Sequence, residues 1–142
     1  MRTVARVTLV WLAGYLLFVV LDLVWISFAA GPMYTRVLGD ALATGATMGL
    51  DRIAAALLTW ALIVATLVGF AVTAGSGVRD AAARGACLGS ALYGVFSLTN
   101  YAVLAAWTLG LVVTDVLWGA VVCAVVSTAL VPLDRRLRGT AA

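Results

Sequence analysis

Two aspartates, Asp22 and Asp115, are the residues of this chain that stand out as candidates for chemistry. Each lies inside a long apolar run, in LDLVW at 21–25 and in TDVLW at 114–118. Carboxylates in such runs are expensive to bury, so they are functional candidates that can exchange protons or hold a ligand. Trp25 and Trp118 follow three residues later, which places each indole on the face of its carboxylate, where the N–H can donate to it.

The composition indicates a membrane protein and excludes several kinds of site. Of 142 residues, 65% are hydrophobic and 11% are charged, which is typical of a chain whose solvent is the bilayer. The sequence contains no His, so His-ligated haem, zinc or copper and His-based catalytic triads are excluded. Cys87 and Cys123 form no CxxC pair, and we expect both to be buried thiols. We therefore expect no metal, no cofactor and no nucleic-acid partner.

Four stretches are long and apolar enough to cross a bilayer as helices, for which roughly 20 residues are needed. They are residues 8–30, 53–74, 84–105 and 109–131. The first exceeds the length of a secretory signal core and carries Asp22, so it is predicted to be retained. The sequence therefore predicts an all-α polytopic membrane protein, a four-transmembrane-helix antiparallel bundle that forms a single domain over 1–142.

Arginine placement predicts the orientation of this bundle. Two of the nine arginines, Arg36 and Arg52, lie on one side of the predicted spans. The other seven lie on the opposite side: Arg2, Arg6, Arg79, Arg84, Arg135, Arg136 and Arg138. By the positive-inside rule both termini are cytoplasmic, and residues 132–142 form a short basic cytoplasmic tail.

The link between the first two spans, residues 31–51, is long enough to have structure of its own. Pro32 suits the first turn of a new helix, and MYTRVLGDAL is predicted to form a short external interfacial helix with Tyr34 and Arg36 at the headgroups. Whether this link is a lid over the bundle or a plain tether is left open by the sequence. The short link after the second span contains Gly75 and Gly77, which are typical of helix ends.

Each predicted span has one face that is expected to turn toward its neighbours. Small residues of the third span, Gly85, Gly89 and Gly94, predict close approach of another helix. In chain order, the four faces are Trp11, Tyr15, Phe18, Asp22 and Trp25; Thr59, Ile63, Thr66, Phe70 and Thr73; Ser90, Tyr93, Ser97 and Asn100; Leu111, Asp115, Trp118 and Val122.

Helical rise places polar residues of all four spans at one depth. Asp22 lies roughly 12 Å and Asp115 roughly 9 Å below the external surface at 1.5 Å per residue, and Asn100 and Thr59 lie near that level. The two carboxylates are expected either to share a proton or to be neutralised from outside by Arg36 or Arg52. The candidate ligand or proton site is Asp22, Asp115, Asn100, Trp25, Trp118, Thr59, Tyr93, Ser97 and Tyr101.

Three segments, LDLVWISFAAGPMYTRVLG, YGVFSLTNYAVLAAW and VTDVLWGAVVCAVVS, resemble an uncharacterised bacterial membrane family, domain of unknown function 2177 (DUF2177). The resemblance covers most of the chain. It implies a small four-helix protein of the bacterial inner membrane with no established activity. Its specific residues are Tyr93, Gly94, Leu98, Thr99, Asn100, Trp107, Asp115, Trp118 and Gly119.

Four interpretations of function follow from these patterns. The preferred one is a small carrier or proton-linked transporter, which at this length would need a homodimer to build alternating access. The second is an accessory or assembly subunit for a membrane lipid-modifying or redox enzyme, with the small-residue face of the third span meeting the partner. The third, an enzyme acting on lipid with the aspartates as acid and base, has the least support. The fourth is a purely structural polar network.

Overall fold

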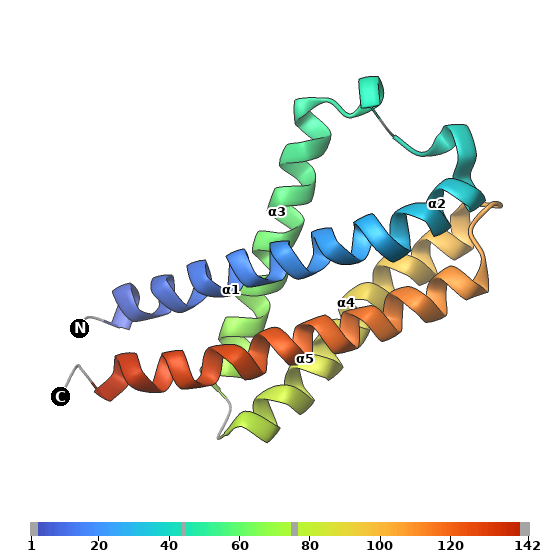
Figure 1. Cartoon of the computed structure of the whole chain (residues 1–142). Coiled ribbons are helices and arrows are strands. Elements are labelled where there is room, and N and C mark those ends of the chain that lie inside the picture. The colour runs from blue at the N-terminus through green and yellow to red at the C-terminus, as the bar shows by residue number, and fades with distance from the viewer. Residues whose placement is uncertain (1–2, 44, 75–76, 140–142) are drawn as a thin grey trace.

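The computed structural model describes residues 3–43, 45–74 and 77–139, and it is all-α, as predicted. Arg2 and Gly75, which were part of the predictions above, lie outside the described residues. Two 3₁₀ turns, Gly39–Ala41 and Gly45–Thr47, lie in the link before α3. The main helical elements are α1 (Thr3–Trp25), the π-turn η1 (Ile26–Ala30), α2 (Gly31–Leu38), α3 (Leu50–Leu67), the π-turn η4 (Val68–Val72), α4 (Val78–Val103) and α5 (Leu109–Gly139) (Figure 1).

Three helical stretches of the described chain are long and apolar enough to cross a membrane: Thr3–Ala41, Leu50–Val72 and Leu109–Gly139. The helix α4 has 26 residues but is less apolar, because Gly, Ser and Tyr recur along it and Asn100 lies near its end. A fourth span therefore stays a prediction. The helix α5 continues through Pro132 to Gly139, beyond the predicted end of the last span at 131, so the described part of the predicted tail is helical.

The closest helix pair is α4 with α5, and glycine makes that contact. A Cβ atom on Gly85 would lie 2.6 Å from the carbonyl oxygen of Cys123, and one on Gly89 would overlap the backbone of Gly119. The close approach predicted for the third span is therefore confirmed at Gly85 and Gly89, and its partner is α5 of the same chain, whereas a Cβ atom at Gly94 would only be in ordinary contact, 3.7 Å from Val116. Because α5 occupies this face, the face is not free for the partner protein that the accessory interpretation assigned to it.

The helix α3 crosses α1 steeply and packs only through its C-terminal half (Figure 1). Residues 51–59 are exposed, whereas Val64 and Leu67 are fully buried. The predicted face of this span is correct only in part, because Thr59, Ile63 and Thr66 line the cavity described below. Phe70 is 65% exposed, and the buried side continues instead through Val68 and Val72 in η4. Thr59, Thr66 and Thr73 recur on one side of the span, but each hydroxyl donates to the carbonyl four residues back in its own helix, so threonines alone do not locate the buried side.

The junction between α1 and α2 is a continuous helix that widens by one π-turn. Pro32 has no N–H, and its ring would crowd the carbonyl four residues earlier in a regular α-helix. The N–H of Gly31 instead donates to the carbonyl of Ile26, five residues back. A Cβ atom at position 31 would lie 2.6 Å from that same oxygen, so glycine is needed there. The short helix expected after Pro32 is present as α2.

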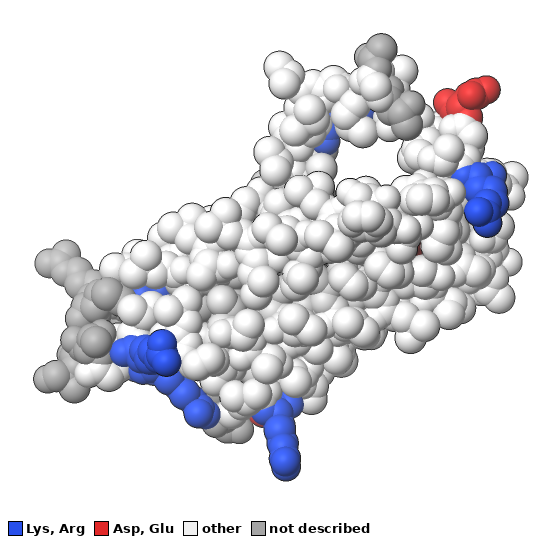
Figure 2. All heavy atoms as spheres, in the orientation of Figure 1, with Lys and Arg blue, Asp and Glu red and all other residues white. Residues whose placement is uncertain are grey.

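Charged side chains gather near the ends of the helices, and the surface between them is uncharged in the view of Figure 2. At the end that holds both termini, Asp134 of α5 is 3% exposed. It forms ion pairs with Arg6 of α1 at 3.3 Å and with Arg138 at 2.8 Å. Arg138 also donates to the carbonyl of Thr73, so this cluster joins α1, α5 and the residue that follows η4.

Candidate functional site

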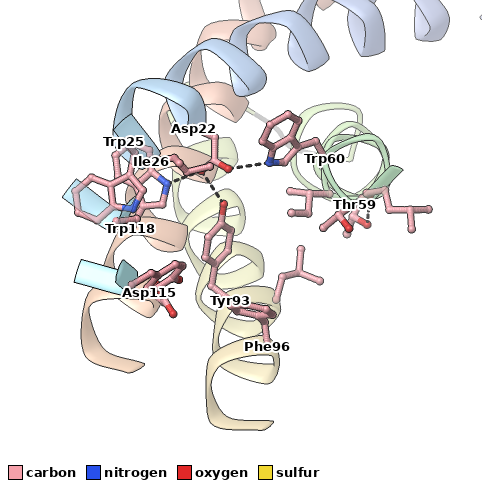
Figure 3. A pocket seen from close by; sticks show the side chains of 15 residues that line it. Asp22, Trp25, Ile26, Thr59, Trp60, Tyr93, Phe96, Asp115 and Trp118 are labelled. Atoms are coloured by element: carbon pink, nitrogen blue, oxygen red, sulfur yellow. Dashed lines mark hydrogen bonds between the residues drawn. The ribbon is translucent and has the colours of Figure 1, made fainter. Parts of the chain in front are cut away.

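Asp22 of α1 is 6% exposed and accepts hydrogen bonds from three other helices. Its Oδ2 accepts from the indole Nε1 of Trp60 on α3 at 2.7 Å. Its Oδ1 accepts from Nε1 of Trp118 on α5 at 2.8 Å and from the hydroxyl of Tyr93 on α4 at 3.2 Å (Figure 3). One carboxylate therefore joins all four long helices, and every group that donates to it is neutral.

Asp115 of α5 is 4% exposed and forms a second cluster. Its Oδ1 accepts from the hydroxyl of Tyr34 on α2 at 2.7 Å, and its Oδ2 accepts from the hydroxyl of Ser97 on α4 at 2.7 Å. Trp107, in the α4–α5 connection, donates to Ser97 at 3.0 Å. The hydroxyl of Ser97 thus accepts one hydrogen bond from Trp107 and donates one to Asp115, and this chain of bonds orients it toward the carboxylate.

The two D-x-x-W motifs act across helices. The indole of Trp118 donates to Asp22 on α1, although its own motif carries Asp115, so the predicted bond within one helix is wrong for Trp118. Trp25 stacks on Trp118 with ring centroids 4.5 Å apart and planes inclined by 6°. The tryptophans of the two motifs therefore stack on each other between α1 and α5. The aspartate of the first motif, Asp22, is the acceptor of one cluster, and that of the second, Asp115, is the acceptor of the other.

Both carboxylates line one cavity of about 380 Å³ between α3 and the other helices. Its wall is mainly aromatic and aliphatic, and the two most exposed of its large apolar side chains are Leu62 of α3 at 61% and Phe96 of α4 at 50%. These two mark an open side between α3 and α4. The lining residues are Asp22, Trp25, Ile26, Ala30, Tyr34, Thr59, Trp60, Leu62, Ile63, Thr66, Leu92, Tyr93, Phe96, Asp115 and Trp118 (Figure 3).

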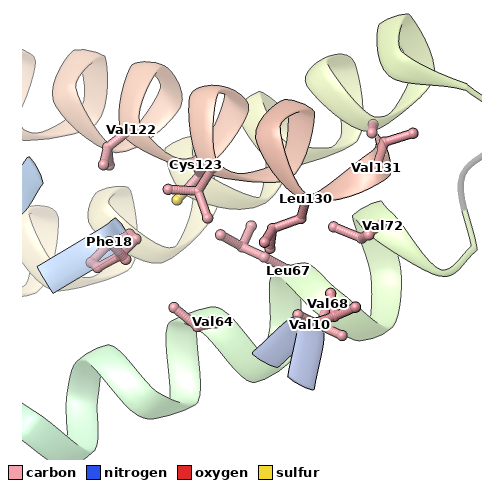
Figure 4. Close-up of a cluster of buried hydrophobic side chains, with 12 residues drawn as sticks. Val10, Phe18, Val64, Leu67, Val68, Val72, Val122, Cys123, Leu130 and Val131 are labelled. Carbon is pink, nitrogen blue, oxygen red and sulfur yellow. The ribbon is translucent and has the colours of Figure 1, made fainter. Parts of the chain in front are cut away.

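An apolar core lies against this polar level. It is centred on Phe18, one turn before Asp22, and on Val122, one turn after Trp118, with Val64 and Leu67 of α3 between the helices (Figure 4). Cys123 is buried in the same core, whereas Cys87 is exposed, so the expectation of two buried thiols was wrong for Cys87. This core fixes the crossing of α1, α3 and α5 and thereby the position of Asp22.

The structure brings together Asp22, Trp25, Tyr93, Asp115 and Trp118 around the cavity, as the sequence placed them. Ser97 also belongs, through its bond to Asp115.

The other three residues of the predicted set are placed differently. Thr59 lines the cavity, but its hydroxyl donates to the carbonyl of Ala55 in its own helix. Asn100 and Tyr101 are not among the lining residues, and within the described chain Asn100 makes no hydrogen bond to either aspartate.

The predicted charge partners are absent from both clusters. In the part of the chain that the structure describes, neither Arg36 nor Arg52 forms an ion pair with Asp22 or Asp115. Both arginines are exposed at the surface. Indole and hydroxyl donors take the place that the arginines were expected to fill.

Sequence reasoning missed three donors. Trp60 was not predicted, although its neighbour Thr59 was. The signal that could have identified it is that a buried indole N–H usually has a hydrogen-bond partner. Tyr34 was placed at the headgroups, and only the turn of α2 over α5 brings its hydroxyl to Asp115. Trp107 lies in a loop, where periodicity gives no information, yet it is 6% exposed and packs with Leu111 and Val112.

The two carboxylates present hydrogen-bond acceptors. Indole nitrogens only donate, and both oxygens of Asp22 receive one, which fits a carboxylate that acts only as an acceptor. Within the described residues no group of three His, Cys, Asp or Glu side chains is placed to hold a metal ion. What the site offers is two buried carboxylates and aromatic walls beside an open cavity.

Comparisons with known proteins place the chain in a family without assigning it an activity. No curated protein and no solved structure matches the chain. A family model described as "Predicted membrane protein (DUF2177)" matches residues 7–131, nearly the whole length. The chain therefore belongs to the DUF2177 family of predicted membrane proteins.

Proposed function

We propose that this protein spans a bacterial inner membrane four times, with both termini cytoplasmic, and binds a hydrophobic small molecule in the Asp22–Asp115 cavity as the binding step of a carrier. The family description supports the membrane, and the excess of arginine beside both termini supports the orientation. The bacterial inner membrane is proposed from the sequence resemblance.

The case for α4 as the fourth span rests on its length and on where its polar residues lie. Twenty-six residues rise roughly 39 Å, more than the roughly 30 Å of a bilayer core. Gly85, Gly89 and Ser97, which lower its hydropathy, are buried within the protein, while Val95 and Leu98 face outward at 71% and 54% exposure. A helix whose polar residues face its neighbours needs less overall apolarity to lie in lipid.

One observation carries the proposal of binding: two carboxylates from different helices line the same apolar cavity. Aspartates in a membrane interior cost on the order of 2.5–3.5 kcal/mol each for insertion. Ligand sites combine apolar walls with a few polar groups that fix orientation, and the cavity has this composition. Its volume of about 380 Å³ is within the usual range for ligand pockets.

The test uses 1-bromododecane, an uncharged quencher of indole fluorescence, added to the protein in lipid nanodiscs. Three of the five tryptophans, Trp25, Trp60 and Trp118, line the cavity. We expect saturable quenching as the cavity fills, on top of the linear quenching by probe dissolved in the lipid.

A matched pair of variants locates the probe. Leu92→Phe narrows the cavity that Leu92 lines, and Leu117→Phe makes the same change at a side chain that is 61% exposed and outside the cavity. The saturable component should be lost in Leu92→Phe and kept in Leu117→Phe. Linear quenching of equal slope in the wild type and both variants would refute binding in the cavity.

A second candidate, the structural network, is favoured by a different observation. Each of the four carboxylate oxygens accepts at least one hydrogen bond from another part of the chain. Such a network can specify helix packing without binding a ligand. It accounts for the bonds but not for the open cavity beside them, and the absence of saturable quenching would favour it.

A further inference from the structure

The charge of the cavity is unbalanced, and this imbalance restricts what it can hold. Two carboxylates line it, and no arginine is among its lining residues. The ion pairs of the described arginines are made with Asp80 and Asp134, away from the cavity. Neutral donors orient the carboxylates but do not cancel their charge, so the potential in the cavity is negative whenever they are ionised. A bound anion would be repelled and a cation attracted.

Both carboxylates that line the cavity keep unused acceptor positions. A carboxylate offers about four acceptor positions. Asp22 accepts three hydrogen bonds and Asp115 accepts two, so about one position on Asp22 and two on Asp115 remain. The clusters are therefore satisfied enough to be stable without a ligand and still able to contact a cationic group.

The walls suit a cation with an apolar body. The faces of Trp, Tyr and Phe attract cations within about 6 Å of the ring centroid, and the attraction is strongest where water is excluded. Trp25, Trp60, Tyr93, Phe96 and Trp118 all line the cavity (Figure 3).

The open side of the cavity suits the same kind of ligand. It lies between Leu62 and Phe96, on the apolar surface that would face lipid in the proposed topology. A ligand entering there must dissolve in the bilayer, which favours an amphiphile over a small hydrophilic ion.

We infer that the cavity is selective for an amphiphilic organic cation, whose charged group lies among Asp22, Asp115 and the aromatic rings while its apolar body extends through the opening between α3 and α4. This inference rests on the proposed function and adds the charge of the ligand. Neutral amphiphiles of the same shape bind more weakly, because nothing else in the cavity offsets the two carboxylates.

The experiment compares dodecyltrimethylammonium with 2,2-dimethyltetradecane, the uncharged analogue in which carbon replaces the ammonium nitrogen. Each is added at increasing mole fraction of lipid to nanodiscs in which 1-bromododecane quenches the tryptophans. We expect the cation to relieve the quenching at a mole fraction at least about tenfold lower than the neutral analogue, a difference of about 1.4 kcal/mol.

Variants assign the preference to the carboxylates. Asp115→Asn, which is nearly isosteric, should remove most of the tenfold preference. Asp40→Asn makes the same change at an exposed residue outside the cavity and should retain it. Circular dichroism and thermal unfolding establish that each variant is folded. If Asp115→Asn fails to fold, the comparison of the two probes on the wild-type protein still shows whether the cavity prefers the cation.

The outcomes separate this inference from the function on which it rests. Equal displacement by the two probes would refute selectivity for cations and leave binding in the cavity intact. A preference that survives in Asp115→Asn and Asp22→Asn would also refute the inference, because the charge would then come from elsewhere. If 1-bromododecane gives no saturable quenching, both proposals are wrong.

Discussion

Replacing Trp60 by phenylalanine tests whether the carboxylate of Asp22 holds α3 to the rest of the protein. The indole N–H of Trp60 donates to Asp22 across α3 and α1 at 2.7 Å. A second indole joins the same two helices: Trp11 of α1 donates to the carbonyl of Ala61 on α3 at 3.2 Å. Both tryptophans are half-buried, so Trp→Phe removes the same atoms from each. The acceptor differs, and Trp11 also stacks on Tyr15, a ring contact that phenylalanine can keep.

The magnitude follows from the acceptor. Hydrogen bonds to charged groups contribute about 1.5–3 kcal/mol in water-soluble proteins and those between neutral groups about 1 kcal/mol. Pairs measured within membranes average about 0.6 kcal/mol, with a maximum of about 1.7. We therefore expect Trp60→Phe to lower the free energy of unfolding by about 1.5 kcal/mol and Trp11→Phe by about 0.6.

The assay is unfolding by SDS in mixed micelles, followed by circular dichroism. A double-mutant cycle of Trp60→Phe with Asp22→Ala isolates the pair, and we expect a coupling of about 1 kcal/mol. A coupling near zero, or equal losses for Trp60→Phe and Trp11→Phe, would refute the reasoning. Asp22 would then contribute nothing to the stability of the α1–α3 contact, and the apolar core alone would hold the two helices together.

Three further predictions concern the two clusters and the α4–α5 contact. Gly89→Ala should lower the melting temperature more than Gly69→Ala, because a Cβ atom at Gly89 overlaps α5 and one at Gly69 meets nothing within 4 Å. Equal melting temperatures would contradict this packing. Asp22→Ala should destabilise more than Asp115→Ala in SDS unfolding, because it leaves three donors without their acceptor instead of two. The reverse order would be inconsistent with the network. Tyr34→Phe should speed amide hydrogen exchange in α2 without affecting α3, and unchanged exchange would mean that the bond to Asp115 does not hold α2.

The faces of α1 and α5 could be predicted because each has a single charged residue, Asp22 or Asp115, in the middle of its long apolar stretch. Placing Asp22 away from lipid also places Phe18, one turn away, and Phe18 is fully buried. The same reasoning places Asp115 and Val122, which are 4% and 1% exposed. A single costly residue fixes the rotation of a helix that otherwise gives no periodic signal.

The face of α3 could be predicted only in part, because this helix carries no charge at the level of the site. Thr59 and Thr66 seemed to mark its polar face, yet each hydroxyl donates to the carbonyl four residues back in its own helix. A threonine that satisfies itself in this way does not need a neighbouring helix. Trp60 is the better marker of the face, since an indole N–H has no acceptor within its own helix.

The partners of the aspartates depend on geometry that spacing does not contain. The sequence placed Asp22 and Asp115 at one depth, but which indole meets which carboxylate is decided by the crossing of α1 and α5. Tyr34 reaches Asp115 only because Gly31 and Pro32 allow a π-turn that redirects α2. The depth of a residue in the membrane follows from its position along one helix, whereas these contacts depend on how two helices cross.

The most direct test of the central claim, that the cavity beside Asp22 binds a ligand, is a titration of the indole N–H resonances. Nitrogen-15-labelled protein in nanodiscs gives one such resonance for each of its five tryptophans. On addition of dodecyltrimethylammonium we expect the resonances of Trp25, Trp60 and Trp118 to shift and saturate, while that of Trp11, outside the cavity, stays in place. Equal shifts of all five, or no shift of Trp60 and Trp118, would contradict the claim.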